Sequence, residues 1–282
     1  MVRTFLISLL LLSSYLGFGQ QIINAKSIDS ITIGELIKHD ATSTFKSVGH
    51  AFTRPLYWKG NDYLKLGSLI GGTMILSVAD DEVNSFFLRQ QNDFPKFIRD
   101  FGWYFGSPQN YFMANVGLYG FGLFTKNEQI RKTSVLIISS SLTTGVITSL
   151  LKTSVGRARP GSGLGNWEFS PFSGEPKFHS FPSGHSSLSI TMAHAIAKQF
   201  DNTWVKIGIY SIGAIPPISR LVDNAHWVTD IAFSTALSII VVDSIDKFLN
   251  KNNLYQAKKS KKNNISWNIS FSTNKIGLRG TF

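Results

Sequence analysis

Residues 134–160 read SVLIISSSLTTGVITSLLKTSVGRARP, an apolar stretch that runs directly into a basic one. The apolar part, Ser134–Leu151, carries no charged residue and lacks the strict period-2 alternation of a strand, so it predicts a helix. Lys152, Arg157 and Arg159 follow it. This stretch therefore predicts a helical fold and a functional site at the end of the helix where the cations lie.

The chain repeats this apolar character in five further segments: Leu66–Ala79, Tyr111–Phe124, Ser187–Ala197, Ile207–Ile218 and Ile231–Val242. None of them shows the period-2 pattern of a strand, so the sequence predicts an all-α protein, a six-helix bundle.

Only two stretches are charge-free over a length near the ~20 residues that span a bilayer, namely Phe101–Thr125 and Thr133–Leu151. The shorter segments either reach the interfaces through snorkelling charged flanks or form core helices of a compact bundle.

Two more polar clusters stand at helix ends. Pro182-Ser183-Gly184-His185 precedes the Ser187–Ala197 segment, and a third cluster, Ser219-Arg220 followed by His226 and Asp230, bridges the last two segments. Because neighbouring helices in such a bundle run antiparallel, these clusters and Lys152 are expected at the same end of the bundle.

The combined clusters suit a tetrahedral oxyanion. Lys152, Arg159 and Arg220 are three cations that need an anionic ligand or acidic partners if they are buried. Arginine's planar fork matches the paired oxygens of a phosphoryl group. Ser183 and Gly184 at a helix start offer backbone N–H groups and the positive end of the helix dipole, which together favour phosphate.

His226 and Asp230 are spaced i, i+4, which places them on one face of a helix. A carboxylate fixes the imidazole tautomer and leaves the other ring nitrogen free to attack. His185 is then the candidate general acid for the leaving oxygen. This set predicts phosphoryl transfer through a phosphohistidine, without a metal or another cofactor.

The motifs Lys-x6-Arg-Pro, Pro-Ser-Gly-His and Ser-Arg-x5-His-x3-Asp resemble the three-part signature of the type 2 phosphatidic acid phosphatase (PAP2) family, which shares its site with vanadium haloperoxidases. The resemblance covers about Leu66 to Lys247 and implies a six-helix core and a metal-independent phosphomonoesterase or diphosphatase. It implies that His226 is the nucleophile, Asp230 its orienting partner and His185 the acid. The implied phosphate ligands are Lys152, Arg159, Ser183, Gly184 and Arg220.

Other polar residues receive plainer interpretations. Arg157 is expected to be a solvated or rim charge, and His179 a rim or substrate-loop residue. His194 lies inside a predicted helix and is expected to pack. Asp80 and Asp81 end a predicted helix and are expected to be solvated. Aromatic residues of the loop 161–179 either grip an acyl or isoprenoid chain or pack as in any loop.

Composition excludes several classes of protein. Hydrophobic residues make up 43% and charged residues 16% of the 282 residues, which excludes a disordered chain. The absence of cysteine excludes disulfides, thiolate nucleophiles and cysteine-based metal sites. The net charge of +11 comes mainly from Lys247–Phe282, which has eight Lys/Arg and no acidic residue. The rest of the chain is only weakly basic, so its charge does not indicate nucleic-acid binding.

The two ends of the chain differ from the bundle. Residues 1–19 combine a basic start, an apolar run and small residues near Gly19, which predicts a cleaved secretory signal peptide. We expect an N-terminal extension over 20–63, the phosphatase core over 64–248 and a basic tail over 249–282. Alternation around a polar turn at 272–275 predicts a short C-terminal β-hairpin, which must pack on another surface to be stable.

The membrane orientation follows from two conflicting signals. Basic loops away from the site, such as those at Arg131 and Lys198, belong in the cytoplasm by the positive-inside rule. A cleaved signal peptide followed by three crossings would instead place Lys152 inside. Either the first segment does not span or the N-terminus is an anchor with an unusual topology, or else the bundle is exported and compact. Both solutions put the site on the periplasmic side of a bacterial cell envelope.

The leading hypothesis is a membrane-associated phosphatase acting on a phosphorylated lipid. The alternatives are a soluble, broad-specificity periplasmic acid phosphatase, a vanadium haloperoxidase and a non-catalytic lipid-binding envelope protein. The sequence does not identify the leaving group or the oligomeric state.

Overall fold

The computed structural model describes residues 31–252, 254–255, 266–272 and 275–281. The predicted signal peptide and the lysine run 258–262 lie outside the described residues. The chain divides into two compact units, Met1–Leu36 and Ile37–Phe282, and the second holds every contact discussed below.

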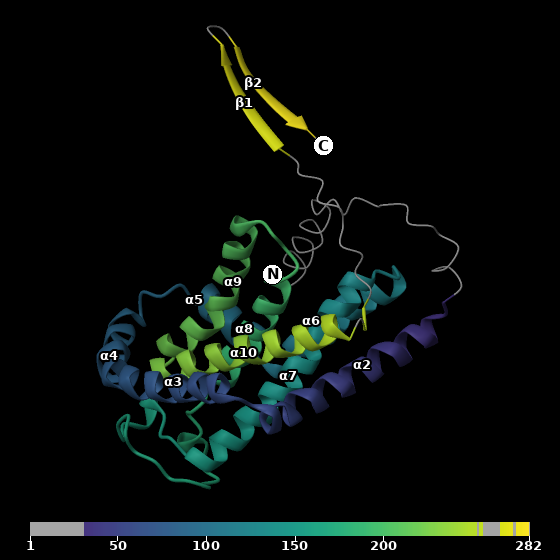
Figure 1. The fold of residues 1–282 in the computed structure, drawn as a ribbon. Coiled ribbons are helices and arrows are strands. Elements are labelled where there is room, and N and C mark those ends of the chain that lie inside the picture. The colour runs from purple at the N-terminus through teal and green to yellow at the C-terminus, as the bar shows by residue number, and fades with distance from the viewer. Residues whose placement is uncertain (1–30, 253, 256–265, 273–274, 282) are drawn as a thin grey trace. The chain divides into compact units, whose positions relative to one another are not determined.

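The described residues before position 253 form α-helices joined by loops and 3-10 turns, and the longest connection lies between α7 and α8 (Figure 1). The α-helices are α2 Ile33–Thr53, α3 Gly60–Leu76, α4 Asp80–Gln90, α5 Lys96–Gly106, α6 Pro108–Phe124, α7 Glu128–Val155, α8 Gly184–Ala197, α9 Thr203–Val222 and α10 Val228–Lys251. The 3-10 turns are η1 Arg54–Tyr57, η2 Ser77–Ala79, η3 Pro160–Ser162 and η4 Pro176–Phe178.

All six predicted apolar segments lie on helices of the structure: α3 with η2, α6, α7, α8, α9 and α10. The all-helical class of the bundle is therefore confirmed. The count of six is not, because α2, α4 and α5 lie outside those segments.

One predicted long stretch is broken. Phe101–Thr125 divides between α5 and α6, since Ser107 has extended backbone angles (φ −74°, ψ 138°) and Pro108 opens the new helix. Proline is well suited to the first turn of a helix, where its missing N–H costs nothing. The described residues include two helices long and apolar enough to cross a membrane, α7 and α10.

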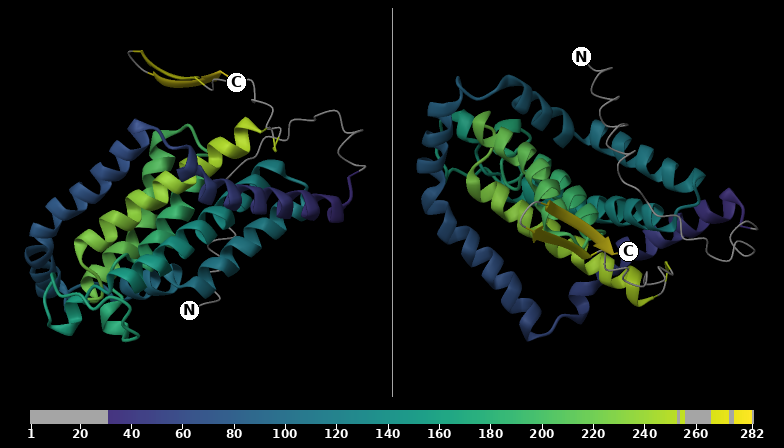
Figure 2. Two further views of the ribbon diagram at one scale, coloured as in Figure 1. Left: turned by 60° about the horizontal axis from the view of Figure 1, so that its bottom comes forward. Right: turned by 90° about the horizontal axis from the view of Figure 1, so that it is seen from above.

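The core forms where α7, α8 and α10 lie side by side, with α9 on α8 and α6 on α7 (Figure 2). Its fully buried side chains include Leu136, Ile137, Ile245 and Leu249. Most serines and threonines of α7 are also buried. Among them, Thr143 and Thr144 donate to the carbonyls one turn back, at 2.9 Å each. These bonds satisfy hydroxyls that would otherwise be costly to bury.

A buried carboxylate ties α2 to this core. Asp40 accepts a two-pronged contact from Arg131 of α7, at 2.7 and 2.9 Å. The hydroxyls of Tyr119 and Tyr255 donate to the same carboxylate at 3.0 and 2.7 Å. The N-terminal extension predicted over 20–63 thus contains a helix that is anchored by charge-assisted hydrogen bonds.

Past the bundle, β1 Ser266–Ser272 and β2 Lys275–Thr281 pair antiparallel, with Ser266 opposite Thr281 and Phe271 opposite Ile276. The prediction that this hairpin packs on another surface stays a prediction.

Candidate active site

The local folds of the three motifs place their polar residues at helix ends. α7 carries Lys152 in its last turn and ends at Gly156, whose φ of +60° suits glycine. A side chain there would also collide with the Ser170 carbonyl. Ser183 caps α8, its hydroxyl accepting from the Ser186 amide at 3.4 Å.

Hydrogen bonds bring the motifs together. Lys152 Nζ donates to the carbonyls of His179 (2.8 Å) and Ser180 (3.3 Å), and Arg159 donates to the His179 carbonyl at 3.1 Å. Ser180 Oγ in turn donates to Asp230 at 2.5 Å. The Ser183 amide donates to the Asp230 carbonyl at 3.3 Å. Residues from all three motifs therefore share partners in one region.

The predicted contact between His226 and Asp230 is present, with Nδ1 and Oδ2 3.3 Å apart. His226 does not share a helix face with Asp230, however, because α10 begins only at Val228 and Trp227 is its cap. The turn before α10 instead brings the imidazole of His226 next to the first turn of that helix. The same Asp230 oxygen accepts from the Trp227 amide at 2.9 Å, which holds the carboxylate in place.

The other Asp230 oxygen reveals a buried network that the sequence analysis missed. Arg157 Nη1 donates to it at 2.8 Å, and Arg157 Nη2 donates to Asp80 at 2.6 Å. Asp80 also accepts from the Thr229 amide and hydroxyl, at 3.0 and 2.7 Å. Arg157 is 5% exposed and Asp80 is fully buried. The expectations of a rim arginine and a solvated aspartate are therefore wrong.

His226 is neutral in this setting. Burial is the main cause that lowers its pKa, to about 3; Asp230 opposes the shift, and Lys152 and Arg159 add to it. Because Asp230 is an acceptor, the Nδ1 proton of the neutral ring points to it and Nε2 keeps its lone pair. This is the protonation state that a nucleophilic histidine needs.

His185 lies in the first turn of α8 and experiences the same positive field. Its Nε2 is buried and, among the described residues, has no hydrogen-bond partner. Burial lowers its pKa to about 4, with further lowering from Arg220, Arg159 and Lys152. A bound anion would offset the repulsion from those cations and raise the pKa.

The balance of charge leaves room for an anion. Arg220 and Arg99 both pair with Asp223. Arg159, in contrast, donates to carbonyls, including that of Ala225 at 2.9 Å. Lys152 and Arg159 have no ion pair with a carboxylate in the part of the chain that the structure describes. Their positive charge is available to an anionic ligand.

Helix α5, which no motif marks, packs closely on this region. A methyl group added at Gly106 would lie 2.6 Å from His185 Cδ2, and one at Gly102 would collide with Ser219. The two glycines are one helical turn apart, so they face the same way. Their lack of side chains lets α5 approach the residues beside the predicted site.

Two histidines outside the predicted chemistry are also hydrogen-bonded. The ring of His179 contacts the Ser173 carbonyl at 2.8 Å. The backbone carbonyl of His179 accepts hydrogen bonds from Lys152 and Arg159, so the ring contact helps to fix this part of the loop. His194 does more than pack: its ring contacts the Tyr210 hydroxyl at 2.6 Å and Asp243 at 3.2 Å.

Comparison with known proteins adds independent information. Residues 133–253 match the model of the PAP2 superfamily. A lipid A 1-phosphatase of Porphyromonas gingivalis is 26% identical over 134 residues, 46% of this chain and 26% of that protein. A lipid A 1-phosphatase of Rhizobium etli is 34% identical over 89 residues, 31% of this chain and 38% of that protein.

The aligned segments thus cover well under half of these relatives' lengths. No solved structure matches the chain.

Proposed function

From the match of residues 133–253 to the PAP2 superfamily, we propose that the chain is a member of it and hydrolyses phosphate or diphosphate esters of lipids without a metal. The observation that supports the proposal most is the neutral His226, oriented by Asp230 and placed in the field of unneutralised cations. The relatives' names indicate phosphatases of a phosphorylated lipid, which agrees with the apolar character of the helices.

In the first step, His226 Nε2 attacks phosphorus and the bond from phosphorus to the leaving oxygen breaks. His185 donates its proton to that oxygen, so the alcohol leaves neutral. Asp230 stabilises the positive charge that develops on the His226 ring. Arg157 keeps Asp230 in position and is itself held by Asp80, so both are positioning residues.

In the second step, water attacks the phosphohistidine and the bond from phosphorus to nitrogen breaks. His185, now neutral, takes a proton from that water. Phosphate leaves and His226 returns to its neutral form. One histidine thus serves as acid and then as base, as microscopic reversibility requires.

The proposed phosphate ligands are Lys152, Arg159, Arg220, Ser183 and Gly184. Electrostatic stabilisation of the transferring group by prepositioned cations and helix N–H groups is the largest catalytic contribution in such sites. The buried setting of Arg220 strengthens this effect, because water screens it less.

The proposed setting is the bacterial cell envelope, with the protein exported and the active site facing the periplasm. The helices α7 and α10 support membrane association. The proposed substrate classes are phosphatidate, isoprenyl diphosphate, phosphatidylglycerol phosphate and a lipid A phosphate. A lipid A phosphate should be tested first, because the similar proteins are lipid A 1-phosphatases.

The test is phosphate release from this panel by the purified full chain in EDTA. Turnover of at least one lipid is expected to persist in EDTA and to be inhibited by vanadate. His226→Ala should abolish it, whereas His39→Ala, which changes a half-exposed histidine of α2, should not. Full activity of His226→Ala would refute the proposed mechanism.

A further inference from the structure

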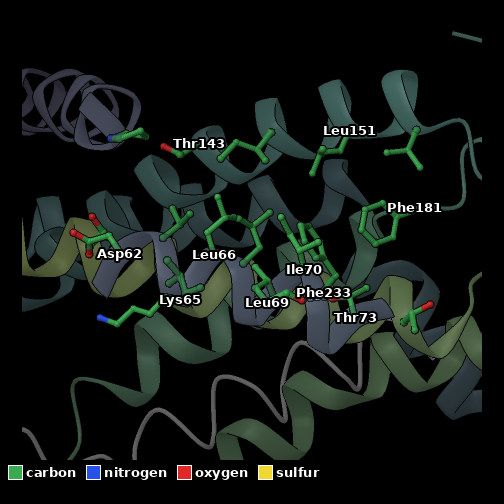
Figure 3. Close-up of a pocket in the computed structure, with 18 of the residues that line it drawn as sticks. Asp62, Lys65, Leu66, Leu69, Ile70, Thr73, Thr143, Leu151, Phe181 and Phe233 are labelled. Atoms are coloured by element: carbon green, nitrogen blue, oxygen red, sulfur yellow. Dashed lines mark hydrogen bonds between the residues drawn. The ribbon is translucent and has the colours of Figure 1, made fainter. Parts of the chain in front are cut away.

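A second feature of the fold is a cavity of about 930 Å³ between α3, α7 and α10. Figure 3 shows Leu66, Leu69 and Ile70 of α3 across from Leu151 of α7, with Phe233 of α10 close to Ile70. Most of the lining is apolar. Its size lies at the upper end of the range for small-molecule sites.

Helix α3 shows why this cavity needs an occupant. None of its residues is buried, although it is apolar over most of its length. Leu66, Ile70 and Thr73 recur at helical spacing along the side that lines the cavity. α3 contacts α10, yet Leu66 and Ile70 remain 38% and 43% exposed. An apolar chain in the cavity would bury them further.

The end of the cavity nearer the catalytic motifs is lined by residues that do not suit a phosphate. Phe181, Arg157 and Thr229 lie there, and the rings of Phe181 and Phe233 are stacked at a tilt, 4.7 Å apart. Arg157 already donates to two carboxylates. None of the proposed catalytic residues or phosphate ligands lines the cavity.

The opposite end is basic. The cavity is lined there by Arg54, Lys65 and Lys247 and by two acids. Asp62 lies beside Arg54, and Asp243 is paired with Lys198. α3 and α10 run antiparallel, since Asp80, just past α3, contacts Thr229 at the start of α10. The start of α3 therefore meets the end of α10. Figure 3 shows Lys65 and Asp62 at the end away from Phe181.

These cations are available. Lys65 and Lys247 are exposed and form no ion pair among the described residues, and Arg54 has only a 3.9 Å contact with Asp62. His50, stacked on Phe248 at 4.4 Å, lies in the same region, close enough to Arg54 and Lys251 that both lower its pKa, after the larger effect of burial.

We propose that this cavity binds one anionic phospholipid, with its phosphate against Arg54, Lys65 and Lys247 and its acyl chains running between α3 and α7 toward Phe181. From Thr229 to Lys247 the wall of α10 extends ~27 Å at 1.5 Å per residue, enough for an extended acyl chain. The lipid is separate from the substrate, whose phosphate belongs at the other end.

The first test measures lipid retained on the detergent-purified full chain by native mass spectrometry, after exposure to phosphatidylglycerol or phosphatidylcholine with the same acyl chains. Phosphatidylglycerol should be retained preferentially. Lys65→Gln combined with Lys247→Gln should weaken that retention about tenfold. The matched control, Lys126→Gln with Lys206→Gln, should leave it unchanged.

Equal retention of both lipids, or unchanged retention in the Lys65/Lys247 variant, would overturn the proposal. The measurement is repeated in His226→Ala, so it needs no turnover and fails independently of the proposed phosphatase activity. The Lys65/Lys247 variant should also hydrolyse a water-soluble phosphate ester at the normal rate.

The orientation is tested with phosphatidylglycerol that carries a photoreactive group at the acyl terminus. Crosslinks are expected near Leu151, Phe181 and Phe233. Crosslinks confined to Lys65 and its neighbours would mean that the headgroup lies at the catalytic end, and would reject a separate lipid in favour of the substrate's own chain.

Discussion

At the scale of single residues, Asp230 is where the catalytic histidine meets a buried ion-pair network. One carboxylate oxygen contacts His226 and the other contacts Arg157, which Asp80 holds from a distant part of the chain. The carboxylate cannot rotate without losing bonds on both sides.

This arrangement predicts a large effect of Asp80→Ala. The change leaves Arg157 with a broken buried ion pair, which should lower the free energy of unfolding by about 3–5 kcal/mol. The kcat on a water-soluble phosphate ester should fall as well, because Asp230 loses its support. The matched control is Asp81→Ala, an exposed neighbour that should change neither quantity. Equal denaturation midpoints for the two variants would contradict the account.

A second prediction concerns the protonation of His185. In the empty site its pKa is about 4, so the ring is neutral at pH 6. Bound phosphate neutralises the nearby cations, so the pKa should rise and the ring should be protonated at that pH. Histidine-selective NMR titration with and without phosphate measures this shift.

The variant Lys152→Gln tests whether the cations lower the His185 pKa. Removing one repelling cation should raise the His185 pKa in the empty enzyme. A His185 titration curve that neither phosphate nor this variant moves would show that the cations do not act on the ring.

Residue types and spacing were enough to predict that the three motifs would meet, because each of them lies at a helix end. Ser180, which contacts both Lys152 and Asp230, belongs to no predicted motif. Asp80 could not be predicted in this way. Acidic residues at a helix start are ordinary, and its partner Arg157 lies far away in sequence. Nothing local distinguishes Asp80 from its exposed neighbour Asp81.

At the scale of elements, α5 packs closely on the site although it carries no motif residue. Its glycines come close to His185 and Ser219. Close approach of a helix depends on residues that have no side chain, and such a requirement is invisible until the partner helix is known.

Gly106→Ala is therefore expected to displace His185 or α5 and to lower kcat at least about tenfold, since small misplacements of catalytic groups are costly. Gly117→Ala in α6 is the matched control: a methyl there meets nothing within 4 Å. It should be neutral or stabilise by about 0.5–1 kcal/mol, because alanine favours a helix. Equal kcat values for the two variants would show that α5 is not close to His185.

The apolar segments were predictable because helices need a continuous apolar face, and each of the six lies on a helix. The break at Ser107 could not be predicted from hydropathy, because one residue between two helices hardly changes the average over a long apolar stretch. Proline at position 108 was the available signal.

At the scale of the whole molecule, the open question from sequence was membrane embedding. Among the described residues, α7 and α10 have the length and composition to cross a membrane, and both are partly buried in the bundle. Many apolar side chains are exposed elsewhere, including Ile75 at 77% and Val78 at 86%. Exposed apolar surface on this scale is typical of a protein that contacts lipid.

We therefore expect the protein to stay with the membrane fraction after carbonate extraction of cells that express the full chain. A peripheral protein of the same envelope should be released in parallel. Complete release of the chain into the soluble fraction would reject embedding and favour the soluble acid phosphatase.

The most direct test of the central claim is to identify the phosphorylated residue. With 4-nitrophenyl phosphate as substrate, His185→Ala should still phosphorylate His226, because 4-nitrophenolate leaves readily without an acid. Water attack then lacks its base, so the intermediate should accumulate. Rapid alkaline quenching and peptide mass spectrometry should find phosphate on His226, and none in the His226→Ala/His185→Ala double variant. Phosphate on another residue would contradict the account.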